Sequence, residues 1–184
     1  MAYRKTEKVL SKIAATRNLL IACSIDIIAS DGLEAFTTRA LAERAGVATG
    51  SIFLHFAGIT ELIVAVASEL RARDIDAMRQ AGDGKRPIPV LIAGISCLAH
   101  IVASKYRLMS AIGTMPAYRD PVQHELAKLI KATGPGERPA ILAAMTYGAI
   151  FETARLGVRS EQTLSTCLLK AIGVPARLIE IPVF

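Results

Sequence analysis

The sequence predicts an all-α fold, and two observations support it. Apolar residues recur at spacings of three and four through most of the 184 residues, and no stretch has the alternating pattern of a strand. Glycine and proline gather at a few places, most clearly in AGDGKRPIP at residues 81–89, where one predicted helix ends and the next is delayed. The chain is therefore expected to be a series of helices without a sheet.

Residues 37–56, TTRALAERAGVATGSIFLHF, are the most informative stretch and predict two short helices around a tight turn. Thr37 can cap the first helix with its side-chain oxygen. Leu41 and Ala45 face inward four residues apart, and Gly46 permits the sharp bend that follows.

The second helix of this stretch is expected to open at Ala48 or Thr49, with Ile52 and Phe56 pressing on the same core. Other residues then turn outward, and the first of them are small enough for another surface to come close. The outward residues are Thr49, Gly50, Ser51, Phe53 and His55. A helix of this kind fits the major groove of DNA.

Together with the residues before it, the stretch resembles the tetracycline-repressor (TetR) family of helix-turn-helix regulators. The pattern begins at LLIACSIDIIASDG, residues 19–32, continues through Phe36 and the LAERAGV run, and closes on GSIFLHF from Gly50. The resemblance implies a DNA-binding domain at residues 1–58, made of a basic arm and a three-helix helix-turn-helix lobe. A long helix would join it to a helical ligand-binding and dimerisation domain at residues 59–184.

The same resemblance implies which residues contact DNA. Thr49, Gly50, Ser51 and His55 would meet base edges or nearby phosphates. Arg39 and Thr38, in the first turn of the preceding helix, would grip the backbone. The chain departs from the family pattern at three positions. Ala48 replaces a capping serine, which leaves one exposed N–H without a side-chain partner. Phe53 replaces a tyrosine and Ile59 replaces a basic residue, which weakens two contacts to the DNA backbone.

The N-terminal segment is strongly basic. It carries Arg4, Lys5, Lys8, Lys12 and Arg17 against the single acidic residue Glu7. A basic arm could lie along phosphates or enter a minor groove, and a solvated, frayed terminus would explain the same charge. The formal net charge of +6 likewise suits an anionic partner.

The remaining helices follow from the apolar spacing and the breaks between them. The predicted helices are residues 14 to 30 or 31, 58 or 60 to 78 or 80, 90–104, 106–112, 122–132, 140–156 and 161–172. In the family the last two helices form a four-helix bundle with their symmetry mates, which implies a homodimer. An intrachain packing face is the alternative.

Family members usually respond to a small molecule bound in the C-terminal lobe. The residues that could line such a cavity are Met109, Met115, Tyr118, Met145, Tyr147 and Phe151. The same residues at helical spacing also suit a plain core. The absence of tryptophan and the scarcity of charge in these helices suggest an apolar or weakly polar effector.

Other classes of function find less support. The three histidines form no metal or catalytic set, His100 suits a core position, and no nucleotide or hydrolase motif occurs, so neither an enzyme nor a cofactor is expected. Three widely spaced cysteines and an N-terminus without an apolar leader indicate a cytoplasmic protein with reduced thiols. Residues 87–104 predict a buried helix rather than a membrane span.

The sequence thus predicts a sequence-specific, ligand-responsive repressor that acts as a homodimer on a near-palindromic double-stranded DNA operator. A DNA-binding dimer without a ligand, an all-α enzyme or small-molecule carrier without operator binding, and a membrane-surface protein are the alternatives.

Overall fold

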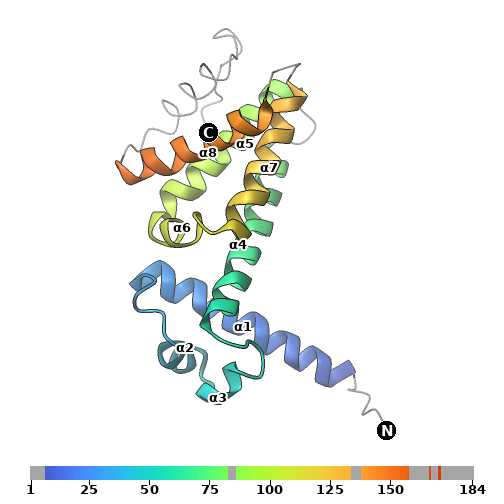
Figure 1. Ribbon diagram of the computed structural model, residues 1–184. Coiled ribbons are helices and arrows are strands. Elements are labelled where there is room, and N and C mark those ends of the chain that lie inside the picture. Colours follow the sequence, from blue (N-terminus) through green and yellow to red (C-terminus); the bar gives the residue numbers. More distant parts are fainter. Residues whose placement is uncertain (1–6, 83–85, 134–137, 158–165, 167–169, 171–184) are drawn as a thin grey trace. The chain divides into compact units, whose positions relative to one another are not determined.

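The computed structural model describes residues 7–82, 86–133, 138–157, 166 and 170. These residues form eight helices and no strand, which confirms the all-α prediction (Figure 1). The helices are α1 Glu7–Asp31, α2 Thr38–Ala45, α3 Thr49–Ile52, α4 Ile59–Ala81, α5 Pro87–Ser104, α6 Tyr106–Ile112, α7 Pro116–Ala132 and α8 Pro139–Arg155. The predicted helix at residues 161–172 lies outside the described residues.

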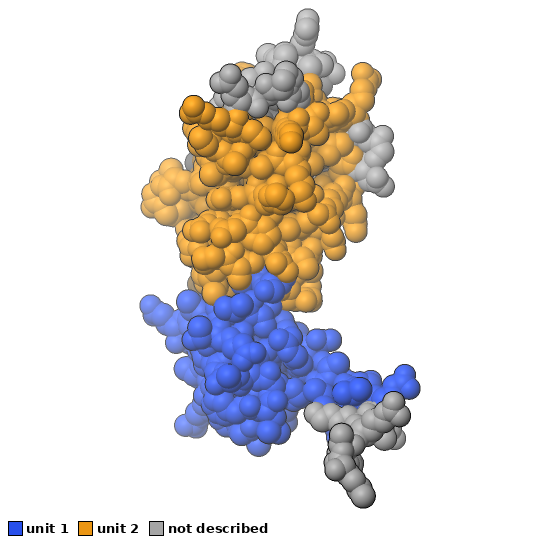
Figure 2. All heavy atoms as spheres, turned by 45° about the vertical axis from the view of Figure 1, so that its right-hand side comes forward, with its two compact units in different colours: residues 1–68 blue, residues 69–184 orange. Residues whose placement is uncertain are grey.

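The chain divides into two compact units, residues 1–68 and 69–184 (Figure 2). The division falls inside α4, so this helix contributes residues to both units. The sequence placed the boundary of the functional domains after residue 58, just before α4 begins, and that placement stays a prediction.

In the N-terminal unit, α2 packs on α1 and α3 packs on α2. The helix α1 contributes Leu20, Ile27 and Ile28, which are at most 2% exposed. Leu41 from α2 and Ile52 from α3 are equally buried and complete this small core. The packing of apolar side chains therefore holds the two short helices, which would be too short to persist alone.

The first helix begins at Glu7, seven residues before the predicted start, and the apolar residues Val9 and Leu10 of these added turns are exposed rather than part of the core. Arg17, which was predicted to belong to the basic arm, lies within this helix and contacts the core of the unit. The Arg17 guanidinium lies 4.7 Å from the centre of the Phe56 ring, a cation–π contact that secures the residues following α3. Arg17 therefore serves packing within the unit, whereas Arg4 and Lys5 lie outside the described residues.

In the C-terminal unit, α7 packs on α8, and α5 packs on both α7 and α8. Helices α5 and α7 begin earlier than predicted because a proline that was taken as a loop residue stands in the first turn of each. Proline suits that position, where the backbone N–H has no partner within the helix. Pro121, also predicted to lie between helices, is inside α7.

Two of the helices, over Val9–Asp31 and Pro87–Ser104, are long and apolar enough to cross a membrane by length and composition alone. In α5, the apolar residues Leu91, Ile95 and Leu98 are fully buried in the core of the unit. Part of the apolar surface of α5 is therefore packed within the protein, in line with the buried helix that the sequence predicted.

A buried polar pair links α4 to α7. The Tyr118 hydroxyl donates to Asp74 Oδ2 at 2.5 Å, and both residues are at most 6% exposed. Burial raises the pKa of Asp74, and the hydrogen bond from Tyr118 opposes that rise by stabilising the carboxylate. Nearby, Tyr147 donates to the backbone oxygen of Gly113 at 2.6 Å.

Removing the hydroxyl in Tyr118→Phe is expected to lower the free energy of unfolding by about 1–3 kcal/mol, because Asp74 loses a hydrogen-bond partner that water cannot easily replace. Chemical denaturation of the purified variant measures the change. Tyr106→Phe is the matched control, since Tyr106 is only partly buried. Equal stability of wild type and Tyr118→Phe would show that the pair contributes nothing to folding.

Candidate nucleic-acid interface

The turn between α2 and α3 has the geometry that the sequence predicted. The Ala40 backbone N–H donates to Thr37 Oγ1 at 3.1 Å, so Thr37 caps α2. Gly46 ends the helix with φ 65°, in the left-handed region that glycine adopts at little cost. Thr37 thus fixes where α2 begins, and Gly46 sets the direction in which the chain leaves α2 and enters α3.

The helix α3 opens at Thr49 after the N-cap residue Ala48, which makes no side-chain hydrogen bond. The predicted loss of a cap at this position is confirmed, and it typically costs about 1 kcal/mol. Helical hydrogen bonding continues beyond α3, because the backbone N–H of Phe56 donates to the oxygen of Ile52 at 3.0 Å. Ile52 and Phe56 are 1% exposed and fix which side faces the core.

The outward residues between positions 49 and 55 form a ridge, which we define as Thr49, Gly50, Ser51, Phe53, Leu54 and His55. Thr49 and Gly50 are exposed, and Ser51 and His55 are half-buried along its sides. Phe53 is 53% exposed and Leu54 is 84% exposed. The sequence reasoning missed Leu54, although its position four residues after Gly50 and two after the buried Ile52 could have indicated an outward direction.

Thr38 and Arg39 are the first two residues of α2 in the helix-turn-helix motif. The Arg39 side chain is 87% exposed, and its Nε atom lies 3.0 Å from Glu43 Oε1. An ion pair this exposed contributes little to stability, so the guanidinium can exchange Glu43 for another anion. Thr38 is half-buried.

The six residues predicted to line an effector cavity lie in different environments. Met109, Tyr118 and Tyr147 are at most 5% exposed. Phe151 is half-buried, and its ring centre lies 4.7 Å from that of Tyr147. Met145 is 64% exposed on α8. Met115 is half-buried. Their part in ligand binding stays a prediction.

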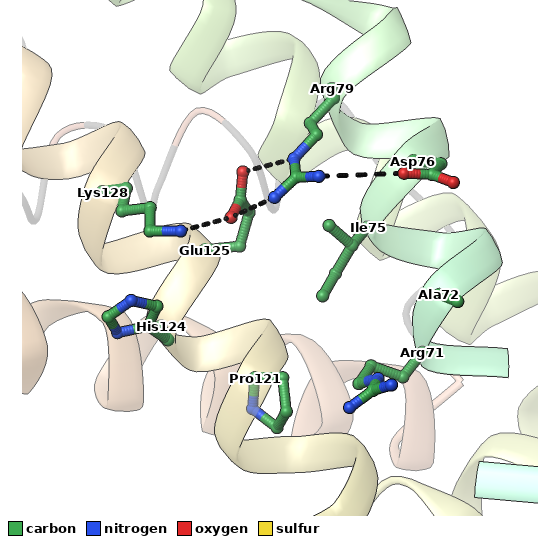
Figure 3. Close-up of a pocket in the computed structure, with 9 residues that line it drawn as sticks. All are labelled: Arg71, Ala72, Ile75, Asp76, Arg79, Pro121, His124, Glu125 and Lys128. Atoms are coloured by element: carbon green, nitrogen blue, oxygen red, sulfur yellow. Dashed lines mark hydrogen bonds and ion pairs between the residues drawn. The ribbon is translucent and has the colours of Figure 1, made fainter. Parts of the chain in front are cut away.

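A groove of about 340 Å³ lies between α4 and α7 and contains none of these six residues (Figure 3). The residues that line it are Arg71, Ala72, Ile75, Asp76, Arg79, Pro121, His124, Glu125 and Lys128. Glu125 organises one end by accepting hydrogen bonds from Arg79 Nε at 2.8 Å and from Lys128 Nζ at 3.3 Å. These two cations, Arg79 first, hold the pKa of Glu125 below its usual value.

The histidines take positions that the sequence did not fully anticipate. His100 is exposed on α5, so its predicted core position is wrong, because it lies on the face of the helix opposite the buried residues. His124 borders the α4–α7 groove. Within the described part of the chain, no group of three or more histidine, cysteine, aspartate or glutamate residues could hold a metal ion.

Comparison with known proteins identifies the motif. Residues 20–66 match the family model described as "Bacterial regulatory proteins, tetR family". This span contains α2, α3, the turn between them and the whole ridge. Over these residues the chain is similar to the tetR family. The resemblance seen in the sequence is thereby confirmed.

Among curated proteins, the chain is similar to an uncharacterized HTH-type transcriptional regulator of Mycobacterium tuberculosis strain H37Rv, and a Mycobacterium bovis protein matches equally well. Each is 28% identical over 115 residues, which is 59% of this chain and 59% of the relative. The match therefore spans less than two thirds of the length of these relatives.

Solved structures share the fold over a longer stretch. RolR without ligand has a TM-score of 0.72 at 16% identity, with 90% of this chain and 97% of RolR covered. FadR from Bacillus subtilis, solved in complex with stearoyl-CoA, has a TM-score of 0.62 at 20% identity, with 86% of this chain and 98% of FadR covered. RolR has also been solved in complex with resorcinol.

The low pKa of Glu125 predicts a pH effect on stability. A carboxyl group whose pKa falls on folding stabilises the protein above its unfolded pKa, and that stabilisation is lost as the pH falls through the folded value. Glu125→Gln should therefore lose less stability than wild type on acidification from about pH 5 to about pH 3. Denaturation at several pH values checks this, with the exposed Glu34→Gln as control. Parallel pH profiles of wild type and Glu125→Gln would contradict it.

Proposed function

We propose that this chain is a sequence-specific transcriptional repressor that binds a near-palindromic DNA operator as a homodimer and releases it when a small molecule binds the C-terminal unit. One observation carries the proposal: a capped helix-turn-helix, within the residues that match the tetR family, presents the exposed ridge at residues 49–55. Chromosomal DNA lies in the bacterial cytoplasm, which is where we place the protein. No catalytic role or cofactor is proposed.

On this proposal the ridge enters the major groove, and α2 contacts the DNA backbone. Thr49, Gly50, Ser51, Phe53 and His55 approach the bases and the nearest phosphates. Arg39 and Thr38 contact phosphates from α2, where the free N–H groups of the helix N-terminus also favour an anion. Backbone contacts supply affinity and register, and contacts to base edges supply sequence preference.

The exposed face of α8 supports the proposed dimer. Ile141 is 51% exposed and Met145 is 64% exposed, and they lie four residues apart on one side of the helix. The small residues Ala144 and Gly148 are exposed on the same side. Small residues let two helices approach closely, and burying the larger side chains between subunits would remove apolar surface from water. Residues 161–172, which the sequence also assigned to the bundle, lie outside the described residues except for 166 and 170.

The proposed effector is an apolar or weakly polar small molecule. RolR and FadR, which share the fold, were solved with resorcinol and stearoyl-CoA. In this chain Met109, Tyr118 and Tyr147 would line the site, with Phe151 and Met115 around it, whereas the exposed Met145 is assigned to the subunit interface. A ligand that prefers the conformation with low operator affinity would release the DNA in proportion to its differential binding.

Selection of genomic fragments bound by the purified full-length chain tests the proposal. The expected result is enrichment of a few fragments that share an inverted repeat, with half-sites about one helical turn apart, since two recognition elements related by twofold symmetry meet successive major grooves. Uniform recovery of fragments at moderate salt would overturn sequence-specific binding.

Replacing Arg39 with alanine should weaken binding to all duplexes alike and lower the salt dependence by about one phosphate contact per subunit. Titration of a selected duplex at several salt concentrations measures this slope. Arg73→Ala is the matched control, because Arg73 also pairs with a glutamate in its own helix, Glu69, and lies in the other unit. An unchanged slope in Arg39→Ala would remove Arg39 from the interface.

A charge on the exposed face of α8 should separate the subunits. In Met145→Glu, a carboxylate buried without a partner would cost several kcal/mol and raise the dimer dissociation constant by about 100-fold or more. Sedimentation velocity over a range of concentrations measures the dissociation constant. Leu33→Glu serves as control, since Leu33 is also exposed and belongs to the other unit. A folded Met145→Glu variant that remains dimeric would place the subunit interface elsewhere.

A further inference from the structure

The ridge and its flanks lack charged side chains. From Ala45 to Thr60 the sequence contains no lysine, arginine, aspartate or glutamate. Guanine is most often read in the major groove by arginine or lysine, and cytosine by a carboxylate that accepts from its amino group. The ridge has neither a cationic side chain for guanine nor a carboxylate for cytosine. Its possible contacts to bases are therefore hydroxyl, imidazole and backbone hydrogen bonds, together with apolar packing.

The apolar residues occupy the most prominent positions. The helical turn continues through this segment, with the backbone N–H of Leu54 donating to the oxygen of Ser51 at 3.3 Å. Gly50 and Leu54 are both exposed, whereas Ile52 between them is 1% exposed, so the two share the side of this turn that faces away from the core. Leu54 is accordingly 84% exposed, the highest value among the exposed large hydrophobic residues of the described chain, and the neighbouring Phe53 is 53% exposed.

Gly50 gives an independent indication that something approaches this face from outside. A Cβ atom placed on Gly50 would have no neighbour within 4 Å, and the residue does not have positive φ. The fold therefore does not require glycine here, although glycine in a helix costs about 1 kcal/mol relative to alanine. A surface that must come close to the backbone at Gly50 would account for the residue, and such a surface would at once touch Leu54.

The chemistry of the major groove narrows what Leu54 can meet. The base edges there present hydrogen-bond donors and acceptors, and the apolar group among them is the C5 methyl of thymine. An aliphatic side chain gains by packing on that methyl and loses by covering a polar edge that it cannot pair.

We propose that Leu54 and Phe53 form an apolar reader of thymine, packing against C5 methyl groups in each half-site, while Gly50 lets the helix backbone approach the base edges. The inference rests on the proposed function and deepens it by naming the base that is read and the residues that read it. Leu54 is the central contact, because it is the more exposed and shares its face with Gly50. Phe53 lies beside it.

The test replaces thymine with uracil in a duplex recovered by the genomic selection. Uracil keeps the pairing with adenine and the O4 acceptor and lacks only the methyl group. Duplexes with uracil at one position of each half-site are titrated with full-length wild type, Leu54→Ala and Leu33→Ala. Leu33 is a matched control because it is a leucine of the same unit, 42% exposed and outside the ridge.

At one or more positions, loss of the methyl should weaken wild-type binding about fourfold per half-site, the equivalent of one buried methyl group. Leu54→Ala should bind the thymine duplex more weakly and no longer distinguish it from the uracil duplex, whereas Leu33→Ala should keep the wild-type difference. Because Leu54 is exposed, its truncation should leave the circular dichroism spectrum and thermal stability unchanged.

Two results of the duplex titrations would overturn the inference. Wild type could bind thymine and uracil duplexes equally at every position, or Leu54→Ala could keep the wild-type difference between them. Either result would leave sequence-specific DNA binding intact, since the duplex was obtained by selection. A selection without any enriched fragment would instead overturn the proposed function itself, so the two failures are distinguishable. Reduced self-association of Leu54→Ala, with unchanged DNA affinity, would assign the patch to contact between copies of the chain.

Discussion

The N-terminal unit depends on the burial of Ile52 and Phe56, which are the inward-facing residues of the segment that follows the turn. Helix α3 has four residues and its first turn lacks a side-chain cap, so its own hydrogen bonds could not keep it folded in water. Apolar packing supplies the missing stabilisation, and the Arg17 guanidinium over the Phe56 ring adds to it. The outward direction of the ridge follows, because burying one face of a helical turn fixes where the opposite face points.

This arrangement separates stability from recognition. The buried residues stabilise the fold. The exposed residues Thr49, Gly50 and Leu54 can therefore be substituted without disturbing the core. Gly50 and Leu54 even run against local preference, since a glycine weakens the helix and an exposed leucine leaves apolar surface in water. Departures of this kind from local preference are expected where a protein contacts something other than itself.

In the C-terminal unit, two carboxylates at the contact between α4 and α7 have pKa values shifted in opposite directions. Asp74 is enclosed with Tyr118, and burial raises its pKa. Glu125 accepts hydrogen bonds from the exposed cations of Arg79 and Lys128, which lower its pKa. The direction of each shift is set by whether desolvation or the neighbouring charge is larger. Both interactions hold α4 and α7 together, one in the core and one at the surface groove.

The sequence by itself determined the features that rest on local chemistry. Thr37 as a cap, Gly46 as the left-handed turn residue, the uncapped Ala48 and the inward pair Ile52 and Phe56 depend on neighbours within a few residues, and such neighbours can be read from spacing.

Only the tertiary structure decided the features that depend on what packs where. Leu54 is the most exposed large apolar residue of the ridge. Arg17, predicted to belong to the basic arm, packs over the Phe56 ring. Asp74 accepts a hydrogen bond from Tyr118, which lies 44 positions away in the sequence. The start of α7 before Pro121 also escaped prediction, since proline can open a helix as well as end one. Exposure and long-range pairing are set by the three-dimensional arrangement of helices, which local spacing does not specify.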